Sequence, residues 1–198
     1  EGPTIALLMA ERTVLNFMQR LSGIATLSRA FADTAAQAGT GVRIVDTRKT
    51  TPGWRHLEKY AVRCGSCYNH RSSLGEHVLI KENHIVAAGS LANAVKRVRD
   101  NAPHAAKIEV EAETLGDVTE ALAAGAEVVL LDNMSPPLIQ KAVEIIGGAA
   151  VVEVSGGVTL ENLLDYALPG VDVISVGALT HSAPAADFSM IIPARVDA

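Results

Sequence analysis

Aromatic side chains are scarce in this sequence. They make up 4% of its 198 residues, although 48% of the residues are apolar. The core must therefore consist of valine, isoleucine, leucine and alanine, the usual material of parallel strands covered by helices. The length suffices for one domain with a sizeable core. No run of eighteen apolar residues occurs, which argues against a membrane-spanning helix.

Cysteine is also rare, since Cys64 and Cys67 are the only two. Their C-x-x-C spacing fits a redox pair or half of a zinc site, and His70 is close enough in sequence to join a partial site. A zinc site needs further ligands, which no second C-x-x-C and no H-x₃-H supplies. We expect two unrelated thiols in a reducing cytoplasm. No signal peptide is apparent, and because the first residue is Glu1 we expect a segment of a longer protein.

Positive charge is nearly absent from residues 109–198, which hold two basic residues against fourteen acidic ones in a chain of net charge −5. Nucleic-acid binding needs a basic face, so this pattern argues against a DNA or RNA partner. Basic residues concentrate instead in residues 43–81: Arg43, Arg48, Lys49, Arg55, Lys59, Arg63, Arg71 and Lys81, against Asp46, Glu58 and Glu76. A local excess of cations in an acidic protein predicts a site for a small polyanion.

Short apolar runs alternate with amphipathic stretches along most of the chain. A helix is expected at residues 10–36, bent or broken near Gly23. The apolar runs occupy residues 42–45, 77–80, 107–110, 127–131, 151–154 and 171–176. Helices are predicted at residues 54–64, 90–100, 115–124, 136–146 and 159–167, the third opening on the capping pair Thr114 and Asp117. This alternation predicts a parallel sheet, either a closed barrel or an open doubly wound sheet.

Polar residues at the strand ends favour the barrel. The residues concerned are Arg48, Lys49, Lys81, Glu111, Asp132, Ser155-Gly156-Gly157 and Gly177. One polar group per strand, converging on one mouth, is how a (β/α) barrel builds its site. No G-x-G-x-x-G follows the first strand, which weakens a dinucleotide-binding alternative. We predict a helical segment at residues 1–40 packing on the barrel, an α/β barrel catalytic domain at residues 41–192, and a tail at residues 193–198.

Two glycine-containing loops form the candidate phosphate site. Ser155-Gly156-Gly157 and Val176-Gly177-Ala178 end the last two strands, where glycine lets backbone N–H groups approach an anion. Barrels commonly bind phosphate at this place. The alternative is that these glycines only make tight turns. His181 follows the second loop and could contact phosphate, although a loop histidine without such a role fits almost as well.

Two carboxylates precede these loops, because Glu111 and Asp132 end the two strands before them. In that position they would hold Mg²⁺ or hydrogen-bond ribose hydroxyls. Alternatively they pair with Lys81 and Arg48. Glu109 shares a strand face with Glu111 by the period of two, and the spacing does not decide between them.

Four cations, Arg48, Lys49, Arg71 and Lys81, form the predicted anion-binding wall. Arginine suits planar carboxylates and lysine suits phosphate oxygens. His70 could donate to a ligand or cap local backbone. Arg55 and Arg63 are expected to be solvated on the helix after the first strand. No activated nucleophile and no G-x-S-x-G is present, which favours electrostatic over covalent catalysis.

Segments in the same order over residues 5–192 resemble the quinolinate phosphoribosyltransferase family: Glu11-Arg12-Thr13, Leu21-Ser22-Gly23-Ile24-Ala25-Thr26, Asp46-Thr47-Arg48-Lys49-Thr50, Asn69-His70-Arg71, Leu79-Ile80-Lys81-Glu82-Asn83-His84, Leu131-Asp132-Asn133-Met134, Ser155-Gly156-Gly157 and Val176-Gly177-Ala178-Leu179-Thr180-His181-Ser182. The resemblance implies a TIM-like (β/α) barrel of phosphoribosyltransferase type II, preceded in the family by an α/β sandwich domain that is missing here. It further implies transfer from phosphoribosyl pyrophosphate to quinolinate with decarboxylation, giving nicotinate mononucleotide, pyrophosphate and CO₂ in NAD biosynthesis, with Mg²⁺.

The resemblance also assigns roles to residues by their motifs. The implied catalytic residues are Lys49, Lys81, Glu111 and Asp132, the last two also holding Mg²⁺ directly or indirectly. The implied substrate-binding residues are Arg12, Thr47, Arg48, Lys49, His70, Arg71, Lys81, Glu111, Asp132, Ser155, Gly156, Gly157, Val176, Gly177, Ala178 and His181. Because the arginine of the Glu-Arg-Thr motif completes a neighbouring subunit's site in the family, a homodimer or larger assembly is expected.

Departures from the family pattern put parts of this expectation in doubt. Gly65-Ser66-Cys67-Tyr68 stands where the family has a glycine run, so Cys67 and Tyr68 would add bulk near the site. The missing sandwich domain caps the barrel mouth in the family, so the chain alone is expected to fold yet be weakly active or inactive. Alternatives are a nicotinate-type phosphoribosyltransferase, a catalytically silent paralogue that binds a phosphorylated metabolite, and an unrelated phosphate-binding barrel.

Overall fold

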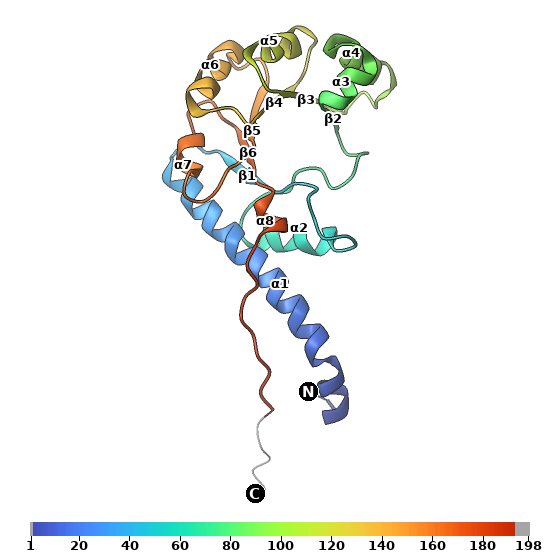
Figure 1. The fold of residues 1–198 in the computed structure, drawn as a ribbon, viewed down its shortest axis with the longest axis vertical. Helices are drawn as coiled ribbons and strands as arrows, with labels where there is room; N and C mark the ends of the chain where they lie inside the picture. Colours follow the sequence, from blue (N-terminus) through green and yellow to red (C-terminus); the bar gives the residue numbers. More distant parts are fainter. Residues whose placement is uncertain (1, 193–198) are drawn as a thin grey trace, which may run out of the picture.

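Six parallel strands form one sheet in the computed structural model, which describes residues 2–192 (Figure 1). The strands are β1 (Arg43–Val45), β2 (Val78–Ile80), β3 (Ile108–Ala112), β4 (Val128–Asp132), β5 (Val151–Ser155) and β6 (Val173–Ser175). All six coincide with predicted apolar runs. The predicted parallel α/β fold is therefore confirmed.

The order of the strands is that of a barrel, β1-β6-β5-β4-β3-β2, with each of β2 to β6 beside its sequence neighbour. β1 and β2 form the two edges, and no ladder joins them within residues 2–192. An isolated bridge between Val45 and Tyr68 extends the β1 edge. The sheet is curved, and Figure 1 shows its hollow side facing α2 (Arg55–Cys64) and α8 (Ala178–His181).

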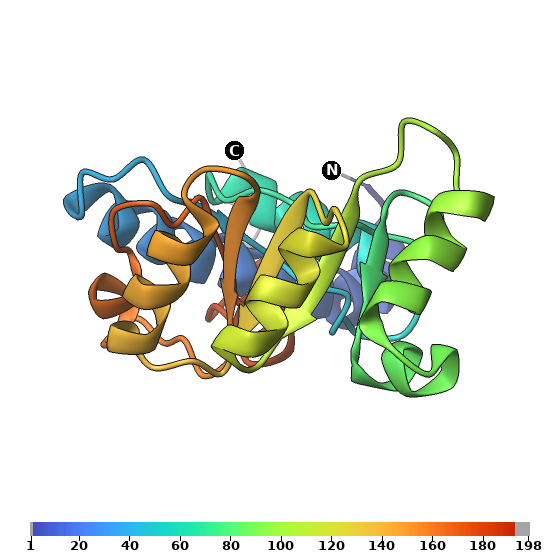
Figure 2. The ribbon, with the colours of Figure 1, turned by 90° about the horizontal axis from the view of Figure 1, so that it is seen from above.

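Helices cover the outer side of the sheet. Figure 2 shows α4 (Leu91–Asn101), α5 (Leu115–Ala123) and α6 (Pro136–Ile146) as a row outside the strands. The predicted capping pair is present at α5, where the Asp117 amide donates to Thr114 Oγ1 at 3.2 Å and the Thr114 amide donates back to Asp117 Oδ2 at 2.9 Å. Two short helices, α3 (Glu82–Ala88) and α8, were not predicted, and α7 (Leu163–Tyr166) is shorter than expected.

The first helix, α1 (Thr4–Gln37), runs unbroken through Gly23, so a break at this position, one of the two predicted alternatives, is wrong. Glycine is required there for contact rather than for bending, because a Cβ atom would collide with the carbonyl oxygen of Pro184. The C-terminal part of α1 packs on the body of the domain, while its N-terminal part projects beyond it (Figure 1). No helix in residues 2–192 is long and apolar enough to cross a membrane.

Alternation along the strands separates an apolar outer face from a polar inner face. The outer side chains include Val110, Val129, Val154 and Ile174, all 0% exposed. The residues that alternate with them face the hollow side of the sheet: Glu109, Glu111, Leu130, Asp132, Glu153, Ser155 and Ser175. The hollow of the sheet is therefore polar, which positions the site described next.

Candidate functional site

A cavity of about 610 Å³ opens at the carboxyl ends of the strands. The predicted site residues that line it are Thr47, Arg48, Lys49, His70, Arg71, Lys81, Glu111, Asp132, Ser155, Gly156 and Gly157. They come from the ends of β1 to β5 and from the segment between β1 and β2. The polar residues at the strand ends predicted that these residues would converge on one cavity.

Some predicted site residues do not line this cavity: Arg12, Val176, Gly177, Ala178 and His181. Arg12 is exposed on the projecting part of α1. Gly177 lies beside the cavity, because a Cβ atom on it would come within 3.0 Å of His181 Nε2 and 3.2 Å of Lys49 Cδ. Thr180 ties this loop to the first strand end, donating from Oγ1 to the Lys49 carbonyl oxygen at 2.8 Å.

A lysine and a carboxylate face each other on one wall of the cavity. Lys81 Nζ lies 2.5 Å from Glu111 Oε1, so the predicted alternative of an ion pair holds for these two. Asp132 instead accepts a hydrogen bond from Asn133 Nδ2 at 2.7 Å. The oxygens of Glu111 and Asp132 at the cavity are hard donors of the kind that Mg²⁺ prefers, so these residues fit the implied ion.

Arg48 and Arg71 lie close together in the cavity lining and form its cationic wall. The Arg71 side chain donates from Nη1 to the His77 carbonyl oxygen at 3.1 Å, and burial together with the nearby Arg48 guanidinium lowers the pKa of Arg71. Arg48 Nε is buried and has no hydrogen-bond partner within the described residues. Like charges with unused donors at one wall favour an anionic ligand that would satisfy both.

The glycine loop after β5 is shaped by close packing. Gly156 has φ 95° and Gly157 has φ 64°, in the left-handed region that favours glycine. A Cβ atom on Gly156 would collide with the side chain of Asn133, which itself has φ 53°. The loop therefore keeps backbone groups at the cavity edge, as a phosphate cradle requires.

Asp46 does not enter the cavity, although it belongs to the same motif as Arg48. It is 0% exposed and accepts hydrogen bonds from Lys59 Nζ, from Asn69 Nδ2 at 2.6 Å and from the His70 amide at 2.9 Å. Burial raises the pKa of Asp46 against these contacts. Its function in the fold is to fix the segment that carries His70 and Arg71.

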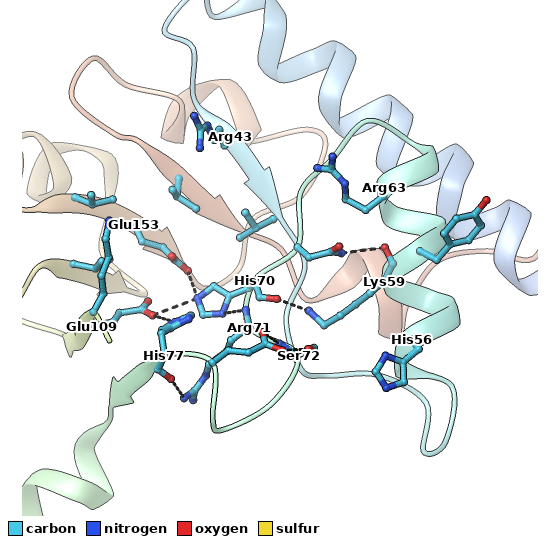
Figure 3. A pocket seen from close by; sticks show the side chains of 18 of the residues that line it. Arg43, His56, Lys59, Arg63, His70, Arg71, Ser72, His77, Glu109 and Glu153 are labelled. Atoms are coloured by element: carbon cyan, nitrogen blue, oxygen red, sulfur yellow. Dashed lines mark hydrogen bonds and ion pairs between the residues drawn. The ribbon is translucent and has the colours of Figure 1, made fainter. Parts of the chain in front are cut away.

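Below the cavity, four titratable side chains fill the hollow of the sheet (Figure 3). His70 Nε2 lies 3.3 Å from Glu109 Oε2 and 3.4 Å from Glu153 Oε1, and His77 Nε2 lies 2.9 Å from Glu109 Oε2. Burial lowers the pKa of His70, but the two carboxylates outweigh it and raise the pKa to about 9. Both histidines in turn hold the pKa of Glu109 below its ordinary value against the effect of burial.

This layer resolves the question of Glu109 and Glu111, since Glu111 lines the upper cavity and Glu109 does not. Glu109 and Glu153 line a second cavity of about 900 Å³ at the amino ends of the strands, shown in Figure 3. Sequence reasoning missed Glu153, Ser175 and Asn133 at the upper cavity. The signal for Glu153 was present, because it stands two residues before Ser155 on the same strand face.

Arg55 was predicted to be solvated, and that prediction is wrong. Its guanidinium donates to Thr50 Oγ1 at 3.1 Å and to the carbonyl oxygens of Ser72 at 3.1 Å and Arg48 at 3.3 Å. It therefore braces the loop that carries the cationic wall. Arg63 is exposed as predicted, and its guanidinium lies 4.9 Å from the centre of the Tyr68 ring.

The bulky residues in place of the glycine run do not obstruct the site. Neither Cys67 nor Tyr68 lines the upper cavity. Cys67 is buried and its Sγ donates to the Ser28 carbonyl oxygen at 3.0 Å, on the α1 side. Cys64 and Cys67 are both free, and burial raises the pKa of the Cys67 thiol to about 12, which disfavours a redox or metal-binding thiolate.

Comparison with known proteins identifies several relatives. The sequence matches the family described as "Quinolinate phosphoribosyl transferase, C-terminal domain" over residues 24–191. It is 48% identical over 189 residues to the "Probable nicotinate-nucleotide pyrophosphorylase" (carboxylating) of Bacillus subtilis, with 96% of this chain and 65% of that protein covered. It is 43% identical over 197 residues to the human nicotinate-nucleotide pyrophosphorylase (carboxylating), with 98% and 66% covered.

Solved structures of proteins with similar sequences also superpose on this fold. The crystal structure of NadC from Streptococcus pyogenes superposes with a TM-score of 0.89 at 42% identity, covering 96% of this chain and 66% of that one. The chain thus spans about two thirds of the length of the relatives that it matches, 65% in the case of the Bacillus protein.

Proposed function

Because the chain belongs to the quinolinate phosphoribosyltransferase family, we propose that it carries the site for phosphoribosyl transfer from phosphoribosyl pyrophosphate to quinolinate. The products would be nicotinate mononucleotide, pyrophosphate and CO₂, in NAD biosynthesis. The observation that carries this proposal is that one cavity is lined both by the arginine pair Arg48 and Arg71 and by Lys81, Glu111 and Asp132.

The cationic wall suits the acceptor. Quinolinate carries two adjacent carboxylates on a pyridine ring, and guanidinium groups pair with carboxylates through two parallel hydrogen bonds. Arg48 has a buried Nε without a partner in the described residues, and His70 lies at the floor. Nicotinate has one carboxylate, which would leave part of this wall unpaired. The site therefore favours the dicarboxylate over a nicotinate-type substrate.

The other wall suits the donor. Displacement of pyrophosphate from C1 of the ribose builds positive charge on the sugar and negative charge on the leaving group. Glu111 and Asp132 would stabilise the first and Lys49 and Lys81 the second. The 5′-phosphate would lie against the loop of Ser155 to Gly157, with the loop after β6 beside it. Glu111 and Asp132 would also hold Mg²⁺, which supplies positive charge toward the pyrophosphate.

Decarboxylation would need no protein nucleophile. Once the ring nitrogen bears the ribose, it is a pyridinium and can accept the electron pair of the breaking carbon–carbon bond. The chain's own residues then have two tasks, which are to hold the dicarboxylate and to exclude alternative orientations.

Several further properties belong to the same proposal. We expect a cytoplasmic homodimer or larger assembly in which Arg12 completes a neighbour's site, since Arg12 is exposed and does not line its own cavity. We also expect the edges β1 and β2 to bound the seam of a TIM-like barrel. A sandwich domain over the mouth would account for the greater length of the relatives. Near-normal turnover by residues 1–198 alone would contradict the need for it.

Ligand binding tests the site without requiring turnover. Calorimetry with quinolinate should show binding that is lost in Arg48→Ala, while nicotinate binds at least tenfold more weakly, because an unpaired buried cation costs about 1.4 kcal/mol or more. Arg97→Ala, which changes an exposed arginine on α4, serves as the control. Equal affinity for the two pyridines, or no effect of Arg48→Ala, would rule out the assignment of the cationic wall.

A further inference from the structure

We propose that Glu153 is a positioning residue that, together with Glu109, holds the imidazole of His70 at the floor of the substrate cavity. This rests on the proposed function for the identity of the ligand, but its geometry stands independently. Glu153 lies in β5 with its side chain in the hollow of the sheet and is 4% exposed. It lines both the upper and the lower cavity, as does His70.

The contact between Glu153 and His70 joins two distant segments. Glu153 Oε1 lies 3.4 Å from His70 Nε2, and Figure 3 shows the carboxylate pointing at the ring from β5 while Glu109 approaches from β3. Neither Glu153 Oε1 nor Glu109 Oε1 has a hydrogen-bond partner within residues 2–192. A buried carboxylate oxygen requires a nearby donor, and the His70 ring is placed to supply one to Glu153 Oε1, while Glu109 faces the two histidine rings through its other oxygen, Oε2.

The rest of His70 is fixed by other contacts. Its amide donates to Asp46 Oδ1 at 2.9 Å, and its carbonyl oxygen accepts from Lys59 Nζ at 2.8 Å. When the ring is neutral, the Arg71 amide donates to Nδ1 at 2.9 Å, whereas the charged ring carries a hydrogen on Nδ1 and cannot accept this bond. With the backbone held by Asp46 and Lys59, the remaining freedom is rotation of the ring, and the two carboxylates limit it from the Nε2 side.

A metal ion is the alternative occupant of this cluster, because one ligand atom each from His70, His77 and Glu109 lies within 4.8 Å of the others. The hydrogen bond from the Arg71 amide argues against it. A neutral ring that accepts at Nδ1 carries its hydrogen on Nε2, and a protonated ring carries hydrogens on both nitrogens. In both states Nε2 presents a hydrogen to the carboxylates rather than a lone pair to a metal.

Several charged and titratable groups face His70: Glu109 from β3, Glu153 from β5, His77 before β2, Lys59 from α2, Asp46 after β1 and the adjacent Arg71. The carboxylates raise the pKa of His70 to about 9 despite burial. Neutralising Glu153 removes one of the two groups that favour the charged ring. The charge of His70 at the cavity floor should therefore depend on Glu153.

The test is Glu153→Gln in the full chain, with Glu144→Gln on the exposed face of α6 as the matched control. NMR of ¹⁵N-labelled histidine, with His70 assigned from a His70→Gln sample, should show the pKa of His70 lowered by about 1, the effect of losing one close opposite charge. The dissociation constant for quinolinate should be about the same in Glu153→Gln and wild type at pH 6. The ratio of the variant's constant to the wild-type constant should then increase with pH, toward about tenfold above pH 9. The control should change neither.

A second variant separates the effect of the lost charge from an effect of unfolding. Glu153→Asp keeps the charge but withdraws it by one methylene, so the pKa of His70 should fall less than in Glu153→Gln. An unchanged pKa of His70 in both variants, with stability lost, would mean that Glu153 is only structural and would overturn the proposal. Zn²⁺ that raises the melting temperature of wild type but not of His77→Ala would overturn it as well, in favour of a metal site.

The titration of His70 is measured without substrate, so the two proposals fail separately. A lowered pKa of His70 in Glu153→Gln together with no binding of quinolinate would support the positioning role and contradict the proposed function. Binding of quinolinate with an unchanged pKa of His70 would support the proposed function and contradict the positioning role.

Discussion

The carboxylate of Asp46 accepts a hydrogen bond from the backbone amide of His70 at 2.9 Å. This contact joins the motif after β1 to the segment before β2, which together supply the cationic wall. Asp46 also pairs with the buried Lys59, whose ammonium donates to the His70 carbonyl oxygen at 2.8 Å. The aspartate beside the basic residues is therefore a brace for the site and not a ligand-binding group.

Asp46→Asn should destabilise the protein by about 3–5 kcal/mol, because it leaves the Lys59 ammonium buried without its counter-charge. Urea unfolding measures the difference in free energy. Asp33→Asn is the control, since Asp33 forms an exposed pair with Arg29 on α1 that should contribute little to stability. Equal effects of the two substitutions would show that the buried pair does not brace the fold.

Lys81→Ala should abolish turnover with little loss of stability. Its pair with Glu111 is half exposed on the lysine side, at 46%, so the pair itself contributes little to folding. In the proposed reaction the ammonium would stabilise charge on the leaving group, which only the transition state develops. Steady-state kinetics and thermal unfolding separate the two effects. Lys96→Ala, which breaks an exposed pair with Asp100, should leave turnover intact.

Arg71→Lys should raise KM for quinolinate by roughly ten- to a hundredfold, because lysine keeps the charge but loses the planar fork that pairs with a carboxylate. The value of kcat should change less. The kinetics are compared with those of Arg97→Lys, an exposed substitution on α4. An unaltered KM would show that Arg71 does not contact the acceptor.

Ser66→Gly should stabilise the protein by about 0.5–1 kcal/mol. Ser66 has φ 68°, a conformation in which a side chain is strained and glycine is not. Its hydroxyl only accepts a long contact of 3.4 Å from the exposed Arg29. Ser73→Gly, at an exposed loop position without positive φ, should instead be neutral or destabilising. The melting temperatures of both variants give the answer.

The stability of the fold should decrease between about pH 6.5 and 9. The pKa of His70 is raised from 6.5 to about 9 in the folded state, so its contribution is complete below 6.5 and is lost as pH rises through 9. The contribution of Glu109 to stability depends on pH with the opposite sign. Because the pKa of Glu109 is lowered in the folded state, this contribution is complete above pH 4.5 and is lost only as the pH falls further. Unfolding free energies at pH 6 and pH 9 should differ by about 3 kcal/mol more in wild type than in His70→Gln. Equal slopes in the two proteins would contradict the role of His70.

The strands and most helices could be predicted from the sequence because one face of each element is apolar at a regular spacing. The upper cavity followed from the same pattern, since the residue after each apolar run must lie at a common edge of a parallel sheet. Glu109 and Glu111 could not be separated in this way. Both share one strand face, and only their depth in the hollow of the sheet distinguishes them.

Other features depend on contacts between distant segments, which local patterns do not reveal. A glycine at position 23 suggested a bend or break in the helix, but the helix continues, and the backbone at Pro184 packs against Gly23. Arg55 was predicted to be a surface residue of α2, but two acceptors from the loop after β1 and a third, the Ser72 carbonyl oxygen, from the segment before β2 surround its guanidinium. The strand pattern could have placed Glu153 on the inner face, but its contact with His70 joins β5 to the segment before β2 and could not be predicted from local patterns.

Release of CO₂ from carboxyl-labelled quinolinate tests the central claim most directly. The protein extended by the proposed sandwich domain, given quinolinate, phosphoribosyl pyrophosphate and Mg²⁺, should release one CO₂ for each mononucleotide formed, and Lys81→Ala should release none. Mononucleotide formation from nicotinate at a similar rate, or no labelled CO₂ from the wild-type protein, would contradict the account.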